Sequence, residues 1–177
     1  MQWCGLLSRM PLQGFSHVGI CVSDLDRSVR FYREVFGFAQ LYALDFSADE
    51  VAATMEQSGA FKSAMLLRSD VRVELLQWVD VPTTGTGERK SMTALGFTHL
   101  SFRVEGIHDL SELVRTHGGA VLEHTLTTLG EGPGATQLLY LLDPDGTRIE
   151  VMSGVPDLSG LTPADVEALT ASADPAS

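Results

Sequence analysis

The chain has 177 residues, 44% of them apolar, and its 12 basic and 23 acidic side chains give a formal net charge of −11. A chain of this length buries about 70% of the surface that its unfolded form exposes and needs no disulfide scaffold, and two cysteines favour a reducing, cytoplasmic setting. No stretch approaches the ~20 apolar residues of a membrane helix, and an acidic chain without a basic stripe is a poor binder of nucleic acid or of anionic membranes. These properties predict a cytoplasmic protein that handles a small molecule.

The first half of the chain opens with a strand and an amphipathic helix. We expect residues 1–13 to be a leader that lies outside the two modules, with Met10 as an alternative start. Their short apolar patch has no basic segment before it, so it is a poor signal peptide. The strand His17–Val22 then runs into an acidic turn, where Ser23 or Asp24 is expected to cap a helix that ends at Gly37. The half closes with a strand, a turn and a second strand that carries Glu74.

The second half repeats this order. Phe97-Thr98-His99-Leu100 answers Phe15-Ser16-His17-Val18, and a turn then leads to a second helix. We expect that helix to bury Ile107, Leu110, Leu113 and Val114. An Asp-Pro-Asp-Gly turn precedes the closing strand, which carries Glu150. The boundaries we predict are residues 14–81 and 96–155 for the two halves, 82–95 for a linker and 156–177 for a mobile tail with a weak helical stretch near 163–169.

The repeat places the same two chemical groups at matching positions in the two halves. His17 and His99 lie on the opening strands, and Glu74 and Glu150 lie on the closing strands. Imidazoles and carboxylates are the natural ligands of a catalytic divalent metal. A lone His or Glu on a strand is more often a structural or solvent-facing residue, but the matched pairing favours a metal site. These four ligands would leave two positions of an octahedral ion open for a chelating substrate.

Several motifs resemble one known family over residues 15–153, namely the vicinal oxygen chelate superfamily. The motifs are His17-Val18-Gly19-Ile20, the turn at Asp24–Ser28, Phe31–Phe38, Gly96–Val104 and Asp143–Glu150. The resemblance implies an α+β fold in which two tandem βαβββ modules form a cupped mixed sheet around a metal. It also implies a homodimer, because members of this architecture often dimerise, with the site formed within one chain or between two.

The glyoxalase I and methylmalonyl-CoA epimerase branch is the closest resemblance, because all four ligands are present. It implies a lyase or isomerase that uses one divalent ion (Zn, Ni, Co or Mn) and a substrate with vicinal oxygens. A carboxylate would remove the proton alpha to a carbonyl, and the metal would stabilise the enediolate. By resemblance Glu150 is the favoured base, with Glu74 possible on the opposite face. Glutathione-dependent members carry Arg and Asn where this chain has Cys21 and Trp78, which disfavours glutathione.

Two alternatives stay open. An extradiol ring-cleaving dioxygenase would use Fe(II) on His17, His99 and Glu150 and would leave Glu74 unused. A non-catalytic binding or resistance protein would hold a small molecule without turnover, although such members generally lack the ligands.

Three further features of the sequence receive ordinary structural interpretations. Cys21 is expected to be a small core residue, and Trp78 and Phe102 to pack the sheets. The glycine-rich segment 130–136 is expected to form a loop at the mouth of the cavity.

Overall fold

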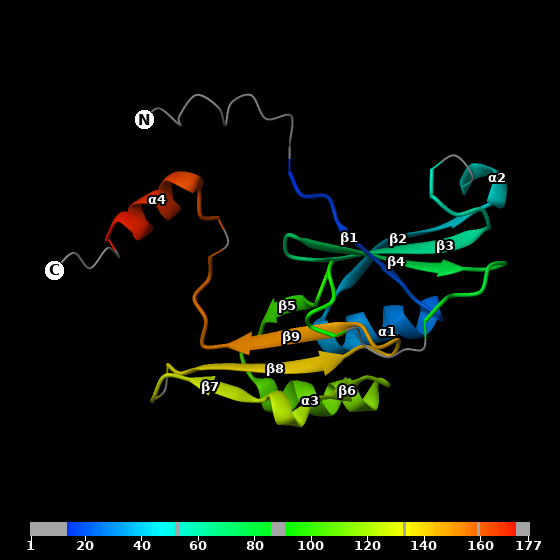
Figure 1. Cartoon of the computed structure of the whole chain (residues 1–177). Coiled ribbons are helices and arrows are strands. Elements are labelled where there is room, and N and C mark those ends of the chain that lie inside the picture. The colour runs from blue at the N-terminus through cyan, green and yellow to red at the C-terminus, as the bar shows by residue number, and fades with distance from the viewer. Residues whose placement is uncertain (1–13, 52–53, 86–90, 133, 159, 173–177) are drawn as a thin grey trace.

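The computed structural model describes residues 14–51, 54–85, 91–132, 134–158 and 160–172, and it contains two mixed sheets, one from each half of the chain (Figure 1). The first has the order β1-β4-β3-β2 and consists of β1 (Val18–Cys21), β2 (Ala39–Phe46), β3 (Phe61–Arg68) and β4 (Val71–Trp78). The second has the order β5-β9-β8-β6, with β7 also paired to β8, and consists of β5 (Leu100–Arg103), β6 (Ala120–Val121), β7 (Thr127–Leu129), β8 (Thr136–Leu142) and β9 (Arg148–Ser153).

The strands of the two sheets pair in the same way. The opening strand lies parallel to the closing strand, in the pairs β1·β4 and β5·β9, and the described neighbours within each sheet otherwise pair antiparallel. This is the α+β tandem βαβββ arrangement that the sequence predicted. The short strand β7 is an addition to that pattern.

The first helix begins and ends as expected. The described α-helices are α1 (Leu25–Phe36), α2 (Ala48–Val51), α3 (Ile107–Thr116) and α4 (Pro163–Ser172), and a short 3-10 helix, η2, spans Glu123–Thr125. The Asp24 side chain caps α1 by accepting a hydrogen bond from the Arg27 amide at 2.9 Å. Gly37 ends α1 in the left-handed conformation, with φ of 66°, which glycine adopts without steric cost.

The buried face of α3 differs from the expected one by one residue. Ile107, Leu110 and Val114 are buried as expected, but Leu113 is 42% exposed. Ser111 completes the buried stripe instead, and its hydroxyl donates to the Ile107 carbonyl at 3.1 Å. The stripe of positions 107, 110, 111 and 114 follows the helical period of 3.6, which leaves position 113 at its edge.

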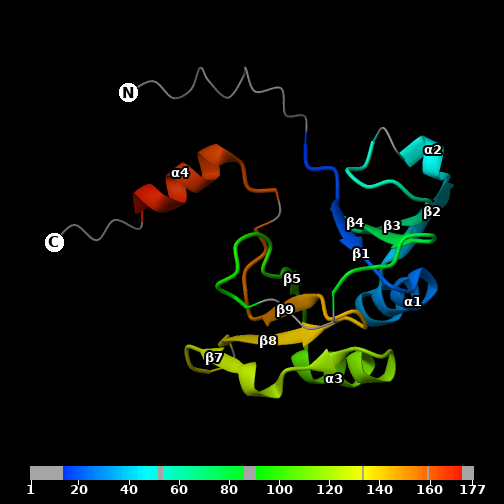
Figure 2. The same cartoon turned by 45° about the vertical axis from the view of Figure 1, so that its right-hand side comes forward.

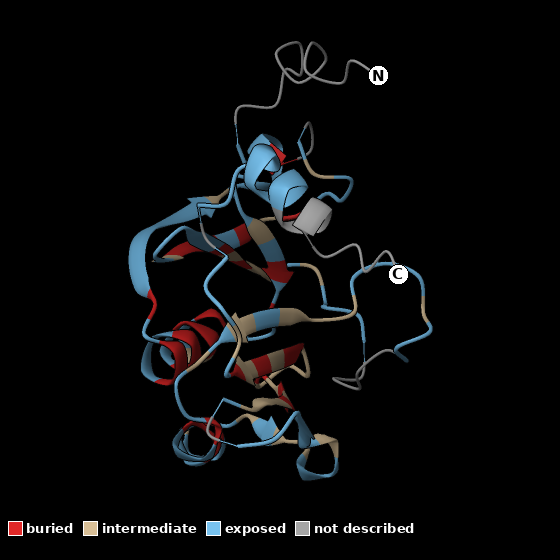
Figure 3. Cartoon of the chain, turned by 90° about the vertical axis from the view of Figure 1, so that its left-hand side faces the viewer, coloured by how far each residue is buried: buried red, intermediate tan, exposed pale blue. Residues whose placement is uncertain are grey.

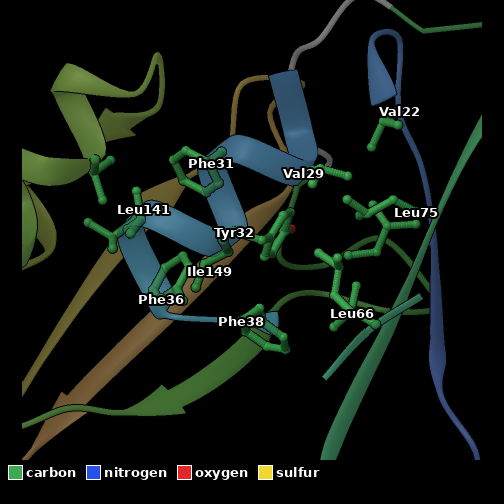
Figure 4. Close-up of a cluster of buried hydrophobic side chains, with 14 of the residues drawn as sticks. Val22, Val29, Phe31, Tyr32, Phe36, Phe38, Leu66, Leu75, Leu141 and Ile149 are labelled. Atoms are coloured by element: carbon green, nitrogen blue, oxygen red, sulfur yellow. The ribbon is translucent and has the colours of Figure 1, made fainter. Parts of the chain in front are cut away.

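The two halves share one hydrophobic core, with α1 between the two sheets (Figure 4). Figure 3 shows that the buried residues gather on α1 and on the strands that flank it. The Phe102 ring of β5 packs on Phe36 and Phe38 with centroids 4.9 and 5.9 Å apart, as expected for a packing residue. A Cβ at Gly119 would lie 2.7 Å from the Phe31 ring, so a glycine there permits the close approach of α1 to the second half.

This shared core determines which way the other face of each sheet points. Val73 and Leu75 of β4 and Ile149 and Val151 of β9 all belong to the core. Because side chains alternate along a strand, the intervening carboxylates lie on the opposite faces. We call these the open faces of the two sheets. Both open faces point away from the shared core.

The ends of the chain and its middle are described only in part. Residues 1–13 and 86–90 lie outside the described residues, so the leader and the linker boundaries stay predictions. In the tail, α4 covers the predicted helical stretch and extends away from the sheets (Figure 2). No described helix is long and apolar enough to cross a membrane.

Candidate metal centre

In the first sheet, His17 and Glu74 lie side by side. His17 immediately precedes β1, and Glu74 sits on the neighbouring strand β4, opposite Gly19. The His17 Nε2 and Glu74 Oε2 atoms are 3.2 Å apart, and the Glu74 side chain is 21% exposed. The fully buried Ser63 of β3 donates its hydroxyl to Glu74 Oε1 at 2.6 Å. This hydrogen bond fixes one carboxylate oxygen and leaves the other directed at the imidazole.

The second sheet repeats this arrangement with His99 and Glu150. The His99 Nε2 and Glu150 Oε2 atoms are 3.6 Å apart. The Ser101 hydroxyl of β5 donates to Glu150 Oε2 at 2.8 Å. In both halves the other imidazole nitrogen, Nδ1, hydrogen-bonds the hydroxyl of the preceding residue at 2.9 Å, which orients the ring. Each His–Glu pair with its serine is called a half-site below.

Each half-site supplies two donors, an imidazole and a carboxylate, that can bind the same divalent ion. Two neighbouring ligands at ~2.1 Å from an ion lie about 3 Å apart, close to the 3.2 and 3.6 Å separations seen here. The two half-sites do not meet within the chain. No group of three or more His, Cys, Asp or Glu among the described residues is close enough to hold a metal. The reason is that the two open faces both point away from the core that the halves share.

Tyr140 is a site residue that the sequence interpretation missed. It lies on β8 directly opposite Glu150, and its ring meets the His99 ring edge-on with centroids 5.4 Å apart. Burial, followed by the interaction of its hydroxyl with the Glu150 carboxylate, raises the pKa of Tyr140. The signal was the hairpin register, because the short Asp-Pro-Asp-Gly turn determines which residue of β8 faces Glu150.

The expectation for Cys21 was wrong. Cys21 is exposed rather than a core residue, because Ile20 and Val22 take the buried positions and alternation puts Cys21 on the open face with His17. The thiol is still partly covered by its surroundings, and this partial burial and the nearby Asp145 carboxylate raise the pKa of Cys21. Trp78 lies four residues beyond Glu74 on the same face, where its ring packs against the Phe61 ring with centroids 5.4 Å apart.

A separate pocket of about 460 Å³ lies beside the glycine-rich loop. Its lining is mostly polar and includes Glu105, Thr128, Gln137, Ser153 and glycines of the loop. None of the four candidate ligands lines it. The loop therefore borders a pocket, but this pocket is not the candidate metal centre, so the placement of the loop at the mouth of the metal cavity stays a prediction.

Comparisons with known proteins identify the family of the chain. The family model of the Glyoxalase/Bleomycin resistance protein/Dioxygenase superfamily matches residues 14–151. A lactoylglutathione lyase of Haemophilus influenzae is 30% identical over 145 residues, which cover 82% of this chain and 96% of that protein. A lactoylglutathione lyase of Arabidopsis thaliana is 30% identical over 142 residues, and the match covers 80% of this chain and 44% of that longer protein.

Solved structures share the fold. A glyoxalase family protein from Bacillus cereus aligns with a TM-score of 0.68 and 21% identity, over 82% of this chain and 97% of that one. The fosfomycin resistance protein FosX from Listeria monocytogenes aligns with a TM-score of 0.53 and 16% identity, over 81% of this chain and 95% of that one. The repeated βαβββ halves, the two His–Glu half-sites and the family match over most of its length show that this chain belongs to the glyoxalase/bleomycin resistance protein/dioxygenase superfamily.

Proposed function

We propose that the protein is a divalent-metal-dependent lyase or isomerase that removes a proton alpha to a carbonyl of a substrate with vicinal oxygens. The observation that carries this proposal is the duplicated half-site. In each sheet an imidazole and a serine-held carboxylate stand 3.2 and 3.6 Å apart on an open face, ready to share one ion. A bound divalent ion would supply Lewis-acid stabilisation of negative charge on the substrate oxygens.

We further propose that two copies of the chain complete the site. Each chain carries both half-sites on faces directed away from its own core, which favours pairing of the first half-site of one copy with the second half-site of another. The strands β1 and β5, which lie beside the half-sites, are both edge strands. A homodimer related by a twofold axis would then hold two complete sites, each with His17 and Glu74 from one copy and His99 and Glu150 from its partner.

The residues of the second half-site suit the chemical step. Glu150 takes the proton from the carbon alpha to the carbonyl, and the C–H electron pair moves toward the carbonyl oxygen. Ser101 hydrogen-bonds Glu150 and holds its carboxylate in one orientation, and Tyr140 lies directly opposite Glu150 on β8. Glu150 can return this proton from its own side, and Glu74, held by Ser63 in the first half-site, would face the substrate from the other side and could deliver a proton that it has first taken from water. Return to the neighbouring carbon gives an isomer, and return to the same carbon from the opposite face gives an epimer.

The open face of the first sheet argues against glutathione as part of the substrate, although relatives carry the name lactoylglutathione lyase. Cys21 and Trp78 both lie on the same open face as the first half-site, where they are available to a ligand. Neither side chain supplies the cation or the amide that recognises a tripeptide carboxylate and backbone.

The dioxygenase alternative is less well supported than the lyase or isomerase. It needs only His17, His99 and Glu150 and gives Glu74 no role. The 2.6 Å hydrogen bond from buried Ser63 instead holds Glu74 beside His17, as expected of a ligand.

Two measurements test the proposal. Protein purified without chelators should contain about one divalent ion per chain when its metal is counted by mass spectrometry, because a homodimer has two sites. In D₂O, the metal-loaded protein should incorporate deuterium alpha to the carbonyl of hydroxyacetone, and Glu150→Gln should abolish this exchange. Absence of bound metal, or exchange that persists in Glu150→Gln, would contradict the proposal. Glu34→Gln, an exposed position on α1, is the matched control.

A further inference from the structure

Arg103 stands on the open face beside the second half-site. It is the last residue of β5, four residues after His99, and alternation puts its side chain on the same face as His99 and Ser101. In the β5·β9 register it lies opposite Met152, two residues beyond Glu150. Its side chain is 43% exposed, so the guanidinium reaches solvent at one end of the row of site residues. The equivalent position of the first half holds the uncharged Cys21.

The partner of Arg103 in the chain is an exposed carboxylate from the tail. Arg103 Nη2 and Asp157 Oδ2 are 2.7 Å apart, and the Asp157 side chain is 58% exposed. The parallel strands β5 and β9 end at the same edge of the sheet, so the segment that leaves β9 passes the end of β5 (Figure 1). An ion pair this exposed contributes little to stability. An incoming anion can therefore replace Asp157 without disturbing the fold.

Arg148, the arginine on β9 of the same sheet, differs from Arg103 in being buried and hydrogen-bonded to the backbone. It is only 8% exposed, and its guanidinium donates to the Thr98 carbonyl at 3.0 Å. Arg148 therefore supports the segment that carries His99. The guanidinium of Arg103, in contrast, is partly exposed and pairs with the exposed Asp157 carboxylate.

We propose that Arg103 binds a carboxylate at the far end of the substrate and so determines its class, an inference that rests on the proposed metal site. The substrate would hold its vicinal oxygens at the His99–Glu150 half-site and its distal carboxylate at Arg103, with Asp157 as the intramolecular occupant that the carboxylate displaces. Four residues of strand span ~13 Å, so a spacer of several bonds must separate the two groups. A guanidinium suits this role because it receives a carboxylate through two parallel hydrogen bonds.

A matched pair of eight-carbon probes tests the assignment on the metal-loaded protein. 2-Oxosuberate and 2-oxooctanoate share the vicinal oxygens and the chain length, but only the first has a distal carboxylate. By titration calorimetry the wild type should bind 2-oxosuberate about tenfold more tightly than 2-oxooctanoate. Arg103→Gln should remove this preference, and Asp157→Asn should raise the affinity for 2-oxosuberate. Arg30→Gln, exposed on α1, should keep the wild-type ratio.

Two results would overturn the role of Arg103: equal affinity for the two probes in the wild type, or a preference that survives in Arg103→Gln. Failure of the metal site would be seen separately as absence of bound metal. If no metal binds, the anion site is tested alone with suberate, a dicarboxylate without the oxo group. Two results would then overturn the anion site: no binding of suberate to the wild type, or equal binding of suberate to the wild type and to Arg103→Gln.

Discussion

The Tyr32 hydroxyl of α1 donates a hydrogen bond to the Asp143 carboxylate of the β8–β9 turn at 3.1 Å, and this contact links the first half of the chain to the second. Both residues are buried, with Tyr32 at 0% and Asp143 at 3% exposure. The other Asp143 oxygen accepts the amides of Asp145 and Thr147, which close the turn. The turn that precedes Glu150 is therefore held by the helix that begins after β1.

Removing this hydroxyl should weaken the join between the halves. Tyr32→Phe keeps the ring in the core but leaves a buried carboxylate oxygen without its donor, so the free energy of unfolding should fall by about 1–2 kcal/mol. Denaturant unfolding measures this change. Tyr42→Phe is the matched control, because Tyr42 is 47% exposed and its loss should be close to neutral. Equal effects of the two substitutions would contradict the role of the Tyr32–Asp143 contact.

Asp145 makes a second contact between the halves, and this contact depends on pH. Partial burial by itself raises the pKa of Asp145, but hydrogen bonds from Ser23 and Arg27 outweigh it and keep the pKa below the ordinary 3.8. The ionised carboxylate thus stabilises the fold above about pH 4, and this contribution is lost as pH falls through the lowered pKa. Asp145→Asn should lower the free energy of unfolding at pH 7 by about 1–2 kcal/mol, with a smaller difference in acid.

The pKa of Asp143, in the same turn, is shifted in the opposite direction from that of Asp145. Burial raises the pKa of Asp143 despite the hydrogen bonds from Thr147, Asp145 and Tyr32. Its contribution to stability is therefore complete below the unfolded pKa and is lost as pH rises through the raised pKa. Asp143→Asn should leave the free energy of unfolding at pH 7 unchanged or higher. If both Asn variants lost stability equally across pH, the assignment of the two carboxylates would be wrong.

The serine behind Glu74 should influence metal affinity without touching the metal. Ser63→Ala removes the 2.6 Å hydrogen bond that orients the carboxylate, and losses of this kind typically cost 10–100-fold in metal affinity. Competition with a chromophoric chelator measures the affinity. Ser91→Ala, which removes an exposed hydroxyl bonded to Thr93, should leave it unchanged. A Ser63→Ala protein with wild-type affinity would show that Glu74 needs no such support or is not a ligand.

A substitution of Glu74 also distinguishes the lyase or isomerase interpretation from the dioxygenase interpretation. If the ion has four protein ligands, Glu74→Ala should remove most of the bound metal and the exchange of the proton alpha to the carbonyl. The dioxygenase interpretation instead predicts Fe(II)-dependent oxygen uptake with catechols that survives in Glu74→Ala. Metal content and an oxygen electrode, applied to the same protein, distinguish the two outcomes.

The repeat and local chemistry were sufficient to predict much of the fold and to single out the four residues that form the two His–Glu pairs. The caps of α1 were predictable because Asp24 has a side chain that accepts a hydrogen bond from a helix amide and Gly37 has no side chain to oppose the left-handed conformation. The repeated order of strand, helix and hairpin likewise implies that the same sheet forms twice. His17 pairs with Glu74 because the opening and closing strands are parallel neighbours. That relation follows from the module and needs no knowledge of the other half.

Features that depend on contacts between the halves could not be predicted from local patterns. Asp143 and Asp145 resemble ordinary turn residues in sequence, and their partners Tyr32 and Ser23 lie 111 and 122 positions away. The exposure of Cys21 likewise follows from which face of β1 meets α1. The direction in which the two half-sites face is a property of the shared core, and so is their separation within one chain.

The most direct test of the central claim counts metal in a mixed dimer. One variant carries His17→Ala with Glu74→Ala, the other carries His99→Ala with Glu150→Ala, and different affinity tags on the two allow the heterodimer to be isolated. If two chains share each site, the heterodimer regains one intact site and should contain one divalent ion, while each variant homodimer contains none. A heterodimer without metal, beside a wild type that binds it, would contradict the account.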